Sequence, residues 1–360
     1  MAKEYRKILI ALLPLFSSGC IKDKPPVPEN TLPSGKPDIY IVCEGNYGNG
    51  NGTLYAYNSL KDSVYGDLYS SANASQPLGD VFQSMTRIDN HYFLVVNNSN
   101  KIVVVDTGTY RQAATISIPQ PRYILQTLAG KAYVTTIWSS KVYVINTSSY
   151  TVSDTIILPS RNPETICLYN GYALVTSWDT ADKYIYKVDI HTDKITDSMA
   201  MTGRAPQEIL TDKEGLIWVL SGDQPLGKTA TLTHLDPSTG AVLDSFTFPS
   251  LADPIKPVFN PTNDTLYFIE TPFYGGTAYN GIYRMSIYDK ALPTTPFIAG
   301  VANQYFYALG IDPVDGKIYI GDPRGFVQQG LVYVYRPDGT KISQFQVGLG
   351  PGHFYFAAAQ

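Results

Sequence analysis

Cysteine, histidine and charged residues are all scarce in this chain of 360 residues. It has three cysteines and four histidines, and Asp, Glu, Lys and Arg together make up 16% of the sequence. Three cysteines are too few for a disulfide-stabilised scaffold, and the four histidines show no spacing typical of metal ligands. The net charge is −4 and no basic stripe is present, which excludes the electrostatic footprint of a nucleic-acid-binding protein.

Long stretches of helical periodicity are also missing, whereas residues typical of strands and turns are abundant. The chain has 28 Tyr, 29 Gly and 25 Pro. Aromatic and β-branched residues favour strands, and Gly, Pro and Asp favour the turns between them. The composition therefore predicts an all-β fold.

A strand-turn-strand unit recurs seven times along the chain. Each unit has an alternating aromatic and aliphatic strand, a polar turn and a second alternating strand. The turns begin at Asn58, Asp106, Asn146, Asp189, Asp236, Ser286 and Arg336. A repeat of about 40 to 50 residues with strands of this pattern is typical of β-propeller blades.

Two further strands complete each unit. One apolar strand precedes every hairpin, the first of them at Ile39–Cys43, and a fourth strand precedes six of the seven. The first unit lacks this fourth strand, but HFYFAAA from His353 has the pattern to pair beside Ile39–Cys43 and close the ring, which leaves no long exposed edge. We predict a seven-bladed β-propeller of four-stranded blades over residues 38–360.

The first 20 residues have the pattern of an export signal. Three basic residues precede an apolar stretch, Ile8–Phe16, that is too short to span a membrane. The segment ends in Ser17-Ser18-Gly19-Cys20, which resembles a bacterial lipoprotein box with Cys20 as the acylated residue; an ordinary signal with an incidental cysteine is the alternative. Residues 21–37 are rich in proline and predict a tether of about 50 Å at ~3.1 Å per residue. We expect the lipid to be the only membrane anchor.

The other two cysteines, Cys43 and Cys167, fall in blades about three positions apart around the ring. A disulfide requires Cα atoms within ~7 Å, which this separation does not permit. We predict buried, reduced thiols.

The candidate site lies on one face of the predicted propeller, where the loops between blades and the loops joining second and third strands emerge together. The second group of loops carries the candidate ligand-binding aromatic residues Tyr47, Trp138, Trp178, Tyr274 and Phe326. The loops between blades and the strand beginnings after them contribute a polar ring of Asp80, Arg122, Glu164, Arg204, Glu208, Lys256, Tyr305 and His353.

Aromatic faces around a polar ring suit a sizeable ligand with an apolar surface and several hydrogen-bonding groups. A corrinoid and an oligosaccharide both fit that description. The alternative interpretation is that the aromatic side chains only fill gaps between neighbouring blades.

Catalysis has less support in the sequence. Glu164 and Glu208 occupy equivalent positions in neighbouring blades and could hold a calcium ion, as in propeller lactonases. Arg122, Arg204 and Lys256 in the same ring argue for neutralising salt bridges instead. Neither a Ser-His-Asp order nor a GxSxG turn is present. The sequence therefore favours a non-catalytic binding module without a metal site or a cofactor.

The segments IVCEGNYGNGNGTLYAYN from Ile41 and KVYVINTSSYTV from Lys141, with the lipoprotein leader, resemble the YncE-like, YVTN-type propeller lipoproteins of Bacteroidetes. The similarity covers residues 38 to 356. Members of this group include surface propellers that capture cobalamin and pass it to a TonB-dependent transporter. The resemblance implies vitamin B12 capture, with cobalamin as a ligand rather than a cofactor.

The pair Lys22-Asp23 resembles the short charged signals that send such lipoproteins to the outer face of the outer membrane. We therefore expect a surface-exposed, lipid-anchored protein of the outer membrane. A glycan-binding or protein-binding propeller and a metal-dependent lactonase-like hydrolase are the alternative functions.

Overall fold

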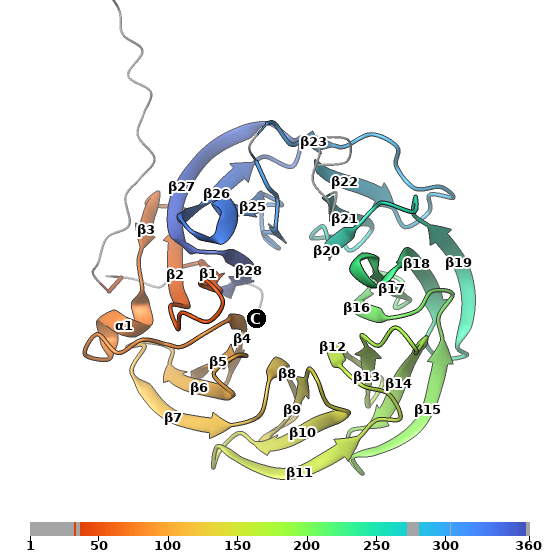
Figure 1. The fold of residues 1–360 in the computed structure, drawn as a ribbon, viewed down its shortest axis with the longest axis horizontal. Coiled ribbons are helices and arrows are strands. Elements are labelled where there is room, and N and C mark those ends of the chain that lie inside the picture. The colour runs from red at the N-terminus through yellow and green to blue at the C-terminus, as the bar shows by residue number, and fades with distance from the viewer. Residues whose placement is uncertain (1–31, 34–36, 272–280, 303, 358–360) are drawn as a thin grey trace, which may run out of the picture.

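The computed structural model describes residues 32–33, 37–271, 281–302 and 304–357. Seven antiparallel sheets of four strands each are arranged as blades around a central axis (Figure 1). The predicted all-β, seven-bladed propeller is confirmed. Within the described ranges, the structure has no helix that is both long enough and apolar enough to cross a membrane.

The blades are numbered along the chain and their strands are given from the axis outward. Blade 1 consists of β28 (Pro351–Phe356), β1 (Ile39–Cys43), β2 (Thr53–Asn58) and β3 (Ser63–Tyr65). Blade 2 consists of β4 (Phe82–Ile88), β5 (His91–Val96), β6 (Lys101–Asp106) and β7 (Gln112–Ser117). Blade 3 consists of β8 (Pro121–Leu128), β9 (Lys131–Thr136), β10 (Lys141–Asn146) and β11 (Thr151–Ile157). Blade 4 consists of β12 (Pro163–Tyr169), β13 (Tyr172–Ser177), β14 (Tyr184–Asp189) and β15 (Lys194–Ala200).

The remaining blades follow the same order. Blade 5 consists of β16 (Pro206–Thr211), β17 (Ile217–Asp223), β18 (Lys228–Asp236) and β19 (Ala241–Thr247). Blade 6 consists of β20 (Pro254–Phe259), β21 (Thr265–Glu270), β22 (Gly281–Ser286) and β23 (Ile298–Ala299). Blade 7 consists of β24 (Ala308–Ile311), β25 (Ile318–Asp322), β26 (Gln329–Tyr335) and β27 (Lys341–Leu349). The short helices of the described chain are α1 (Leu68–Ala72), η1 (Gln224–Leu226) and η2 (Arg324–Phe326).

The two ends of the propeller sequence pair with each other in blade 1. Ile39 lies opposite Phe356 and Ile41 lies opposite Phe354 in an antiparallel register. The C-terminal strand begins at Pro351, two residues before the predicted start. The predicted ring closure is therefore confirmed.

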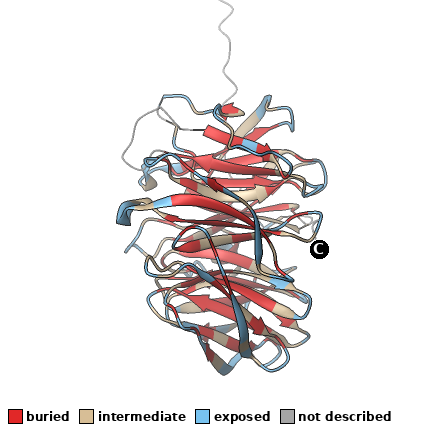
Figure 2. Cartoon of the chain, turned by 90° about the vertical axis from the view of Figure 1, so that its right-hand side faces the viewer, coloured by how far each residue is buried: buried red, intermediate tan, exposed pale blue. Residues whose placement is uncertain are grey.

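The hydrophobic core consists of clusters between neighbouring blades. In β6, Ile102 and Val104 pack toward blade 3, whereas Val103 and Val105 pack toward blade 1. Successive side chains of a strand point to opposite faces of its sheet, so a strand between two blades is apolar on both faces. Figure 2 shows the result, with buried strands inside and exposed segments at the turns and outer strands.

The two cysteines of the propeller have different environments. Cys43 in β1 is buried, Cys167 in β12 is half-buried, and both are free thiols. The prediction of reduced cysteines is thus confirmed, whereas the prediction that both are buried was wrong for Cys167. Burial raises the pKa of each thiol.

Candidate functional site

The innermost strands of six blades contain a β-bulge close to their first residues. The register shifts in β4, β8, β12, β16, β20 and β28. A bulge inserts a residue that has no direct partner in the neighbouring strand and redirects side chains locally. The residues at these bulges are Gln83, Arg122, Glu164, Gln207, Lys256 and Gly352. Because the inner strands surround the axis (Figure 1), the bulges concentrate the polar residues of the predicted ring there.

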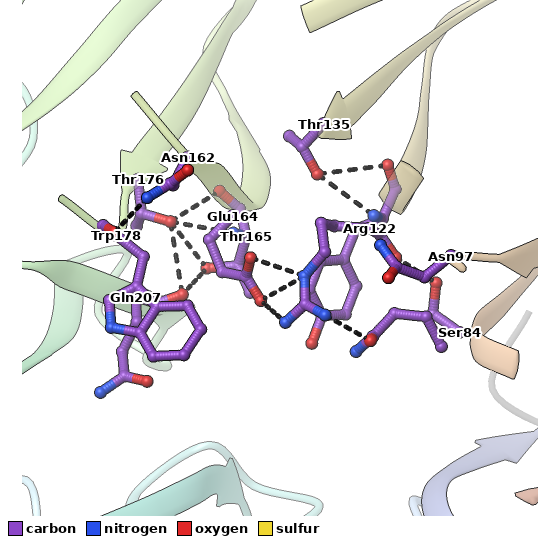
Figure 3. Close-up of polar contacts among 12 residues, drawn as sticks. Ser84, Asn97, Arg122, Thr135, Asn162, Glu164, Thr165, Thr176, Trp178 and Gln207 are labelled. Atoms are coloured by element: carbon purple, nitrogen blue, oxygen red, sulfur yellow. Dashed lines mark hydrogen bonds and ion pairs between the residues drawn. The ribbon is translucent and has the colours of Figure 1, made fainter. Parts of the chain in front are cut away.

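One half of this ring is internally paired, and we call Gln83, Arg122 and Glu164 the closed half. The Arg122 guanidinium donates from Nε to Glu164 Oε2 at 2.8 Å and to Oε1 at 3.1 Å, and its Nη2 contacts the same carboxylate. Its Nη1 donates to Gln83 Oε1. Figure 3 shows the contacts between Arg122 and Glu164. Burial alone would lower the pKa of Arg122, but the adjacent Glu164 carboxylate raises it above the usual value.

The backbone of the closed half is also held in place. At the bulge of β8, the Tyr123 N–H donates to Thr135 Oγ1 at 3.1 Å. At the equivalent bulge of β12, the Thr165 N–H donates to Thr176 Oγ1 at 2.9 Å. Two buried threonines thus replace the carbonyl partners that the bulges remove (Figure 3).

The other half of the ring is unpaired, and we call Glu208, Lys256 and His353 the open half. These three side chains line one cavity of about 210 Å³, together with Tyr123 and apolar residues of β24 and β28. None of the three makes a side-chain hydrogen bond or an ion pair with any residue that the structure describes. The Lys256 ammonium lies 5.8 Å from the centroid of the Tyr307 ring.

The electrostatics of the open half depend on burial. Burial raises the pKa of Glu208 to about 7, with a further increase from Glu164 that Lys256 and Arg122 oppose. Burial lowers the pKa of His353 to about 4, and the charge of Lys256 lowers it further. At neutral pH, His353 is therefore neutral, and Glu208 is divided between its two protonation states.

A larger pocket of about 400 Å³ lies beside the open half, and we call it the mouth pocket. Glu44, Tyr47, Tyr307 and Phe326 line it. The Tyr307 hydroxyl donates to Glu44 Oε2 at 3.1 Å, and the Phe326 ring meets the Tyr307 ring edge-on at 5.1 Å. The Tyr305 ring stacks on the Tyr307 ring with their centroids 6.4 Å apart. Burial raises the pKa of Glu44, against the opposing effects of Lys256 and the Tyr307 hydrogen bond.

Two backbone features shape the mouth pocket. A Cβ at Gly352 would lie 2.1 Å from Glu44 Oε1, so only glycine leaves room for this carboxylate. The Asn46 side chain donates to the Phe326 carbonyl at 2.9 Å and thereby ties the loop of blade 1 to that of blade 7. Phe326 has a φ of 60°, a conformation that a bulky residue adopts only when its surroundings enforce it.

The two loop tryptophans lie apart from the mouth pocket and line a slot of about 120 Å³. Trp138 is 66% exposed and has a φ of 64°. The Asn162 side chain accepts from the Trp138 N–H at 2.8 Å and donates to the Trp178 carbonyl at 3.1 Å. One asparagine therefore fixes both tryptophan loops, and Figure 3 shows its contact with Trp178.

The predicted polar ring contained two residues that the structure places elsewhere. Asp80 is buried between loops, where it accepts from the Gly48 N–H at 2.9 Å and from the Asn98 side chain. Arg204 is exposed and donates to the Ala181 carbonyl at 2.6 Å. Placing these residues in the ring, and giving Arg204 a neutralising ion pair there, was wrong. Both have local backbone and loop partners.

The other predicted residues are divided among four groups. Arg122 and Glu164 belong to the closed half, Glu208, Lys256 and His353 to the open half, Tyr47, Tyr305 and Phe326 to the mouth, and Trp138 and Trp178 to the slot. Tyr274 and Cys20 lie outside the described residues, as do the predicted signal segment 1–20 and most of the tether 21–37.

Glu44 and Tyr307 are the site residues that the sequence reasoning missed. Glu44 directly follows a fully buried strand, β1. A carboxylate directly after an apolar strand can be recognised in the sequence as a candidate site residue. Tyr307 stands just before the inner strand of blade 7, where a tyrosine among many tyrosines gives no comparable indication.

A calcium ion shared by Glu164 and Glu208 receives no support from the geometry. Arg122 already occupies both carboxylate oxygens of Glu164. Among the described residues, no group of three or more His, Cys, Asp or Glu side chains is arranged to hold a metal ion.

Comparison with solved structures places the fold among other propellers. A quinonprotein alcohol dehydrogenase-like protein from Bacteroides thetaiotaomicron superimposes with a TM-score of 0.67 and 16% identity, over 89% of this chain and 78% of that one. The periplasmic gluconolactonase PpgL of Pseudomonas aeruginosa superimposes with a TM-score of 0.65 and 12% identity, over 89% of this chain and all of that one. Similarities at such low identity show the fold alone.

Sequence comparison identifies the family. The uncharacterized protein YwhL of Bacillus subtilis is 28% identical over 222 residues, which are 59% of this chain and 43% of that protein. The match thus covers less than half of the length of this relative. Residues 38–360 match the profile of DUF5074, a domain of unknown function, and the chain belongs to that family.

Proposed function

We propose that this protein is a binding propeller that captures a sizeable ligand at the mouth of its axis, with cobalamin as the first candidate. The observation on which this depends is the mouth pocket, where aromatic walls surround a half-buried carboxyl–phenol pair. It adjoins a cavity lined by polar side chains that have no hydrogen-bond partner among the described residues. Ligand pockets typically combine apolar walls with a few convergent polar groups of this kind.

The position of the mouth pocket and the tryptophan slot favours a large ligand over a small one. The mouth pocket and the tryptophan slot are formed by loops that join the second and third strands of their blades, so they open on the same face. Aromatic side chains contribute large contact areas with little loss of conformational entropy. A flat ligand with several polar arms would use both the stacking surfaces and the channel residues.

The first 37 residues support a location at the outer membrane for this activity. An acylated Cys20 and the tether of residues 21–37 would hold the propeller away from a membrane, and Lys22-Asp23 would direct it to the outer surface. In that position the protein would deliver its ligand to a TonB-dependent transporter. The YncE-like resemblance of the EGN segment supports the same assignment, and a glycan or protein ligand is the alternative within the binding class.

A hydrolase is the second candidate, and the open half is the observation in its favour. Glu208 is an unpaired carboxyl group whose pKa burial raises to about 7, which suits a general acid or base at neutral pH. A gluconolactonase is among the proteins with a similar fold. Hydrolysis of lactones is therefore the activity to assay if no ligand is found.

The direct test is a titration of residues 21–360 with cyanocobalamin, followed by calorimetry and by tryptophan fluorescence, with and without a chelator. We expect saturable, chelator-insensitive binding with a Kd tighter than about 1 μM. Phe326→Ala and the double variant Trp138→Ala, Trp178→Ala should each weaken binding about 10-fold to 100-fold. Tyr288→Ala is the matched control, since Tyr288 is exposed in a loop between third and fourth strands, on the opposite face.

The outcomes separate the candidates. Binding that survives the mouth and slot variants unchanged would place the ligand elsewhere on the propeller. No binding at accessible concentrations would remove cobalamin, and the same protein should then be tested with glycans and with small lactones.

A further inference from the structure

The open half combines two features that a purely structural role does not explain. Glu208, Lys256 and His353 face one cavity without a hydrogen bond or ion pair to any described residue. Lys256 also has a φ of 53°, a strained conformation for a residue with a side chain. All three residues are half-buried. Withdrawing polar groups from water without giving them partners costs free energy, so each such group in a native protein calls for an explanation.

The closed half shows that the same scaffold can pair its charges. Arg122 and Glu164 occupy bulges of the same kind in neighbouring blades and make a bidentate ion pair. Glu208 and Lys256 also lie in neighbouring blades, on β16 and β20, yet they make no ion pair. The fold therefore permits pairing, and the open half leaves its groups available.

The charges around the cavity indicate the kind of group that fits. Lys256 supplies one positive charge, and the carboxyl groups of Glu208 in the cavity and Glu44 in the mouth pocket supply up to two negative charges. A free carboxylate or phosphate would be attracted by Lys256 but repelled by both glutamates, and an ammonium group would be attracted by the glutamates but repelled by Lys256. A neutral group that both donates and accepts hydrogen bonds can pair with Lys256 and with the glutamates without repulsion.

We propose that the open half of the ring binds a primary carboxamide arm of the ligand, with Lys256 donating to the amide oxygen and Glu208 accepting from the amide nitrogen. His353 lies in the same cavity as a neutral side chain that can serve either role. The cavity of about 210 Å³ exceeds by far the roughly 15 Å³ that one water requires, so a short aliphatic amide can enter. The inference rests on the proposed function only in treating this arm as part of a larger ligand at the mouth.

The test uses three small probes of equal size, namely propionamide, propionate and propylammonium, with the purified protein at pH 8. Saturation-transfer NMR detects weak binding of each probe directly. We expect the strongest saturation for propionamide, and at least a fivefold loss of that signal in Lys256→Met and in Glu208→Leu. Arg204→Met is the matched control, because it removes an exposed charge from the same face and should leave the signal unchanged.

Several results would overturn the inference. These are stronger saturation by propionate or propylammonium, a propionamide signal that persists in Lys256→Met, and no propionamide signal at 50 mM. Thermal unfolding of each variant verifies that a lost signal does not reflect a lost fold, and Glu208→Ala, which also lacks an acceptor oxygen, repeats the test if Glu208→Leu is unstable.

The result is independent of the cobalamin titration. If propionamide binds as expected while cyanocobalamin does not, the proposed ligand is wrong and the amide site stands. If cyanocobalamin binds and propionamide does not, the amide site is wrong and the proposed function stands. Displacement of propionamide by cyanocobalamin would show that both occupy one site.

Discussion

The closed and open halves of the ring share a backbone design and differ in what their side chains do. Each places polar residues at a bulge or directly beside one, near the beginning of inner strands. In the closed half, Arg122 and Glu164 are bonded to each other, whereas in the open half Glu208 and Lys256 have no such partner in the part of the chain that the structure describes. Polar side chains at or beside a bulge thus lie around the axis. Contacts with the neighbouring blade determine whether such a side chain is bonded within the protein or free to bind a ligand.

The largest expected difference between the halves is in stability. Arg122→Met would leave Glu164, with a side chain only 5% exposed, as an uncompensated buried charge. We expect a loss of about 3–5 kcal/mol in the free energy of unfolding. Lys256→Met should cost less than about 1 kcal/mol, because no ion pair is lost. Guanidinium unfolding of both variants measures the difference.

The double variant Arg122→Met, Glu164→Gln is the control for this prediction. It removes both charges of the closed half and should recover most of the loss. Equal destabilisation by Arg122→Met and Lys256→Met would contradict the division of the ring into two halves.

The next difference is in pH dependence. The pKa of Glu208 is raised from 4.5 to about 7 in the folded chain. Between these values the folded chain binds more protons than the unfolded chain, so the contribution of this carboxyl group to stability declines as pH rises, by roughly 1–3 kcal/mol in total. Glu208→Gln should remove this decline when unfolding is measured from pH 4.5 to 8.

His353 should act in the opposite direction. Its pKa is lowered from 6.5 to about 4, so the unfolded chain binds more protons between these values and stability falls as pH falls. The two effects partly cancel in the wild type between pH 4.5 and 6.5. The Glu208→Gln variant should therefore become more stable as the pH rises over that range. The His353→Gln variant should become less stable as the pH rises over the same range. Parallel pH profiles for all three proteins would show that neither group is buried as described.

The fold was predictable because its determinants are local and repeated. Alternating strands such as Lys101–Asp106 are followed by polar turns at a nearly constant interval, and both faces of each strand are apolar because blades pack on either side. Ring closure was predictable because the first unit lacks its fourth strand and the C-terminal segment contains one extra strand. None of these inferences required knowledge of a specific side-chain contact.

The site was less predictable because bulges break the two-residue periodicity of a strand at its beginning. Asp80 and Arg204 were wrongly placed in the ring, and each precedes a residue with positive φ, Val81 at 54° and Ala205 at 56°. The chain turns at that residue, so the side chain before it contacts neighbouring loops. Which ring residues pair also depends on the distance between side chains of adjacent blades. The sequence does not give that distance.

The smallest expected effect compares glycine and alanine at the two halves. Lys256 has a φ of 53°, where alanine is strained and glycine is not, and Arg122 is not among the residues with positive φ. Left-handed backbone costs a residue with a Cβ about 1–2 kcal/mol, and the greater freedom of glycine in the unfolded chain offsets about 0.5–1 kcal/mol of this. Lys256→Gly should thus be more stable than Lys256→Ala by about 0.5–1 kcal/mol. In a Glu164→Gln background, Arg122→Gly should instead be less stable than Arg122→Ala by a similar amount. Unfolding of the four variants tests this reversal. If the glycine variant were the more stable, or the less stable, at both positions, the strain at Lys256 would be absent and its backbone would not be held in place for a ligand.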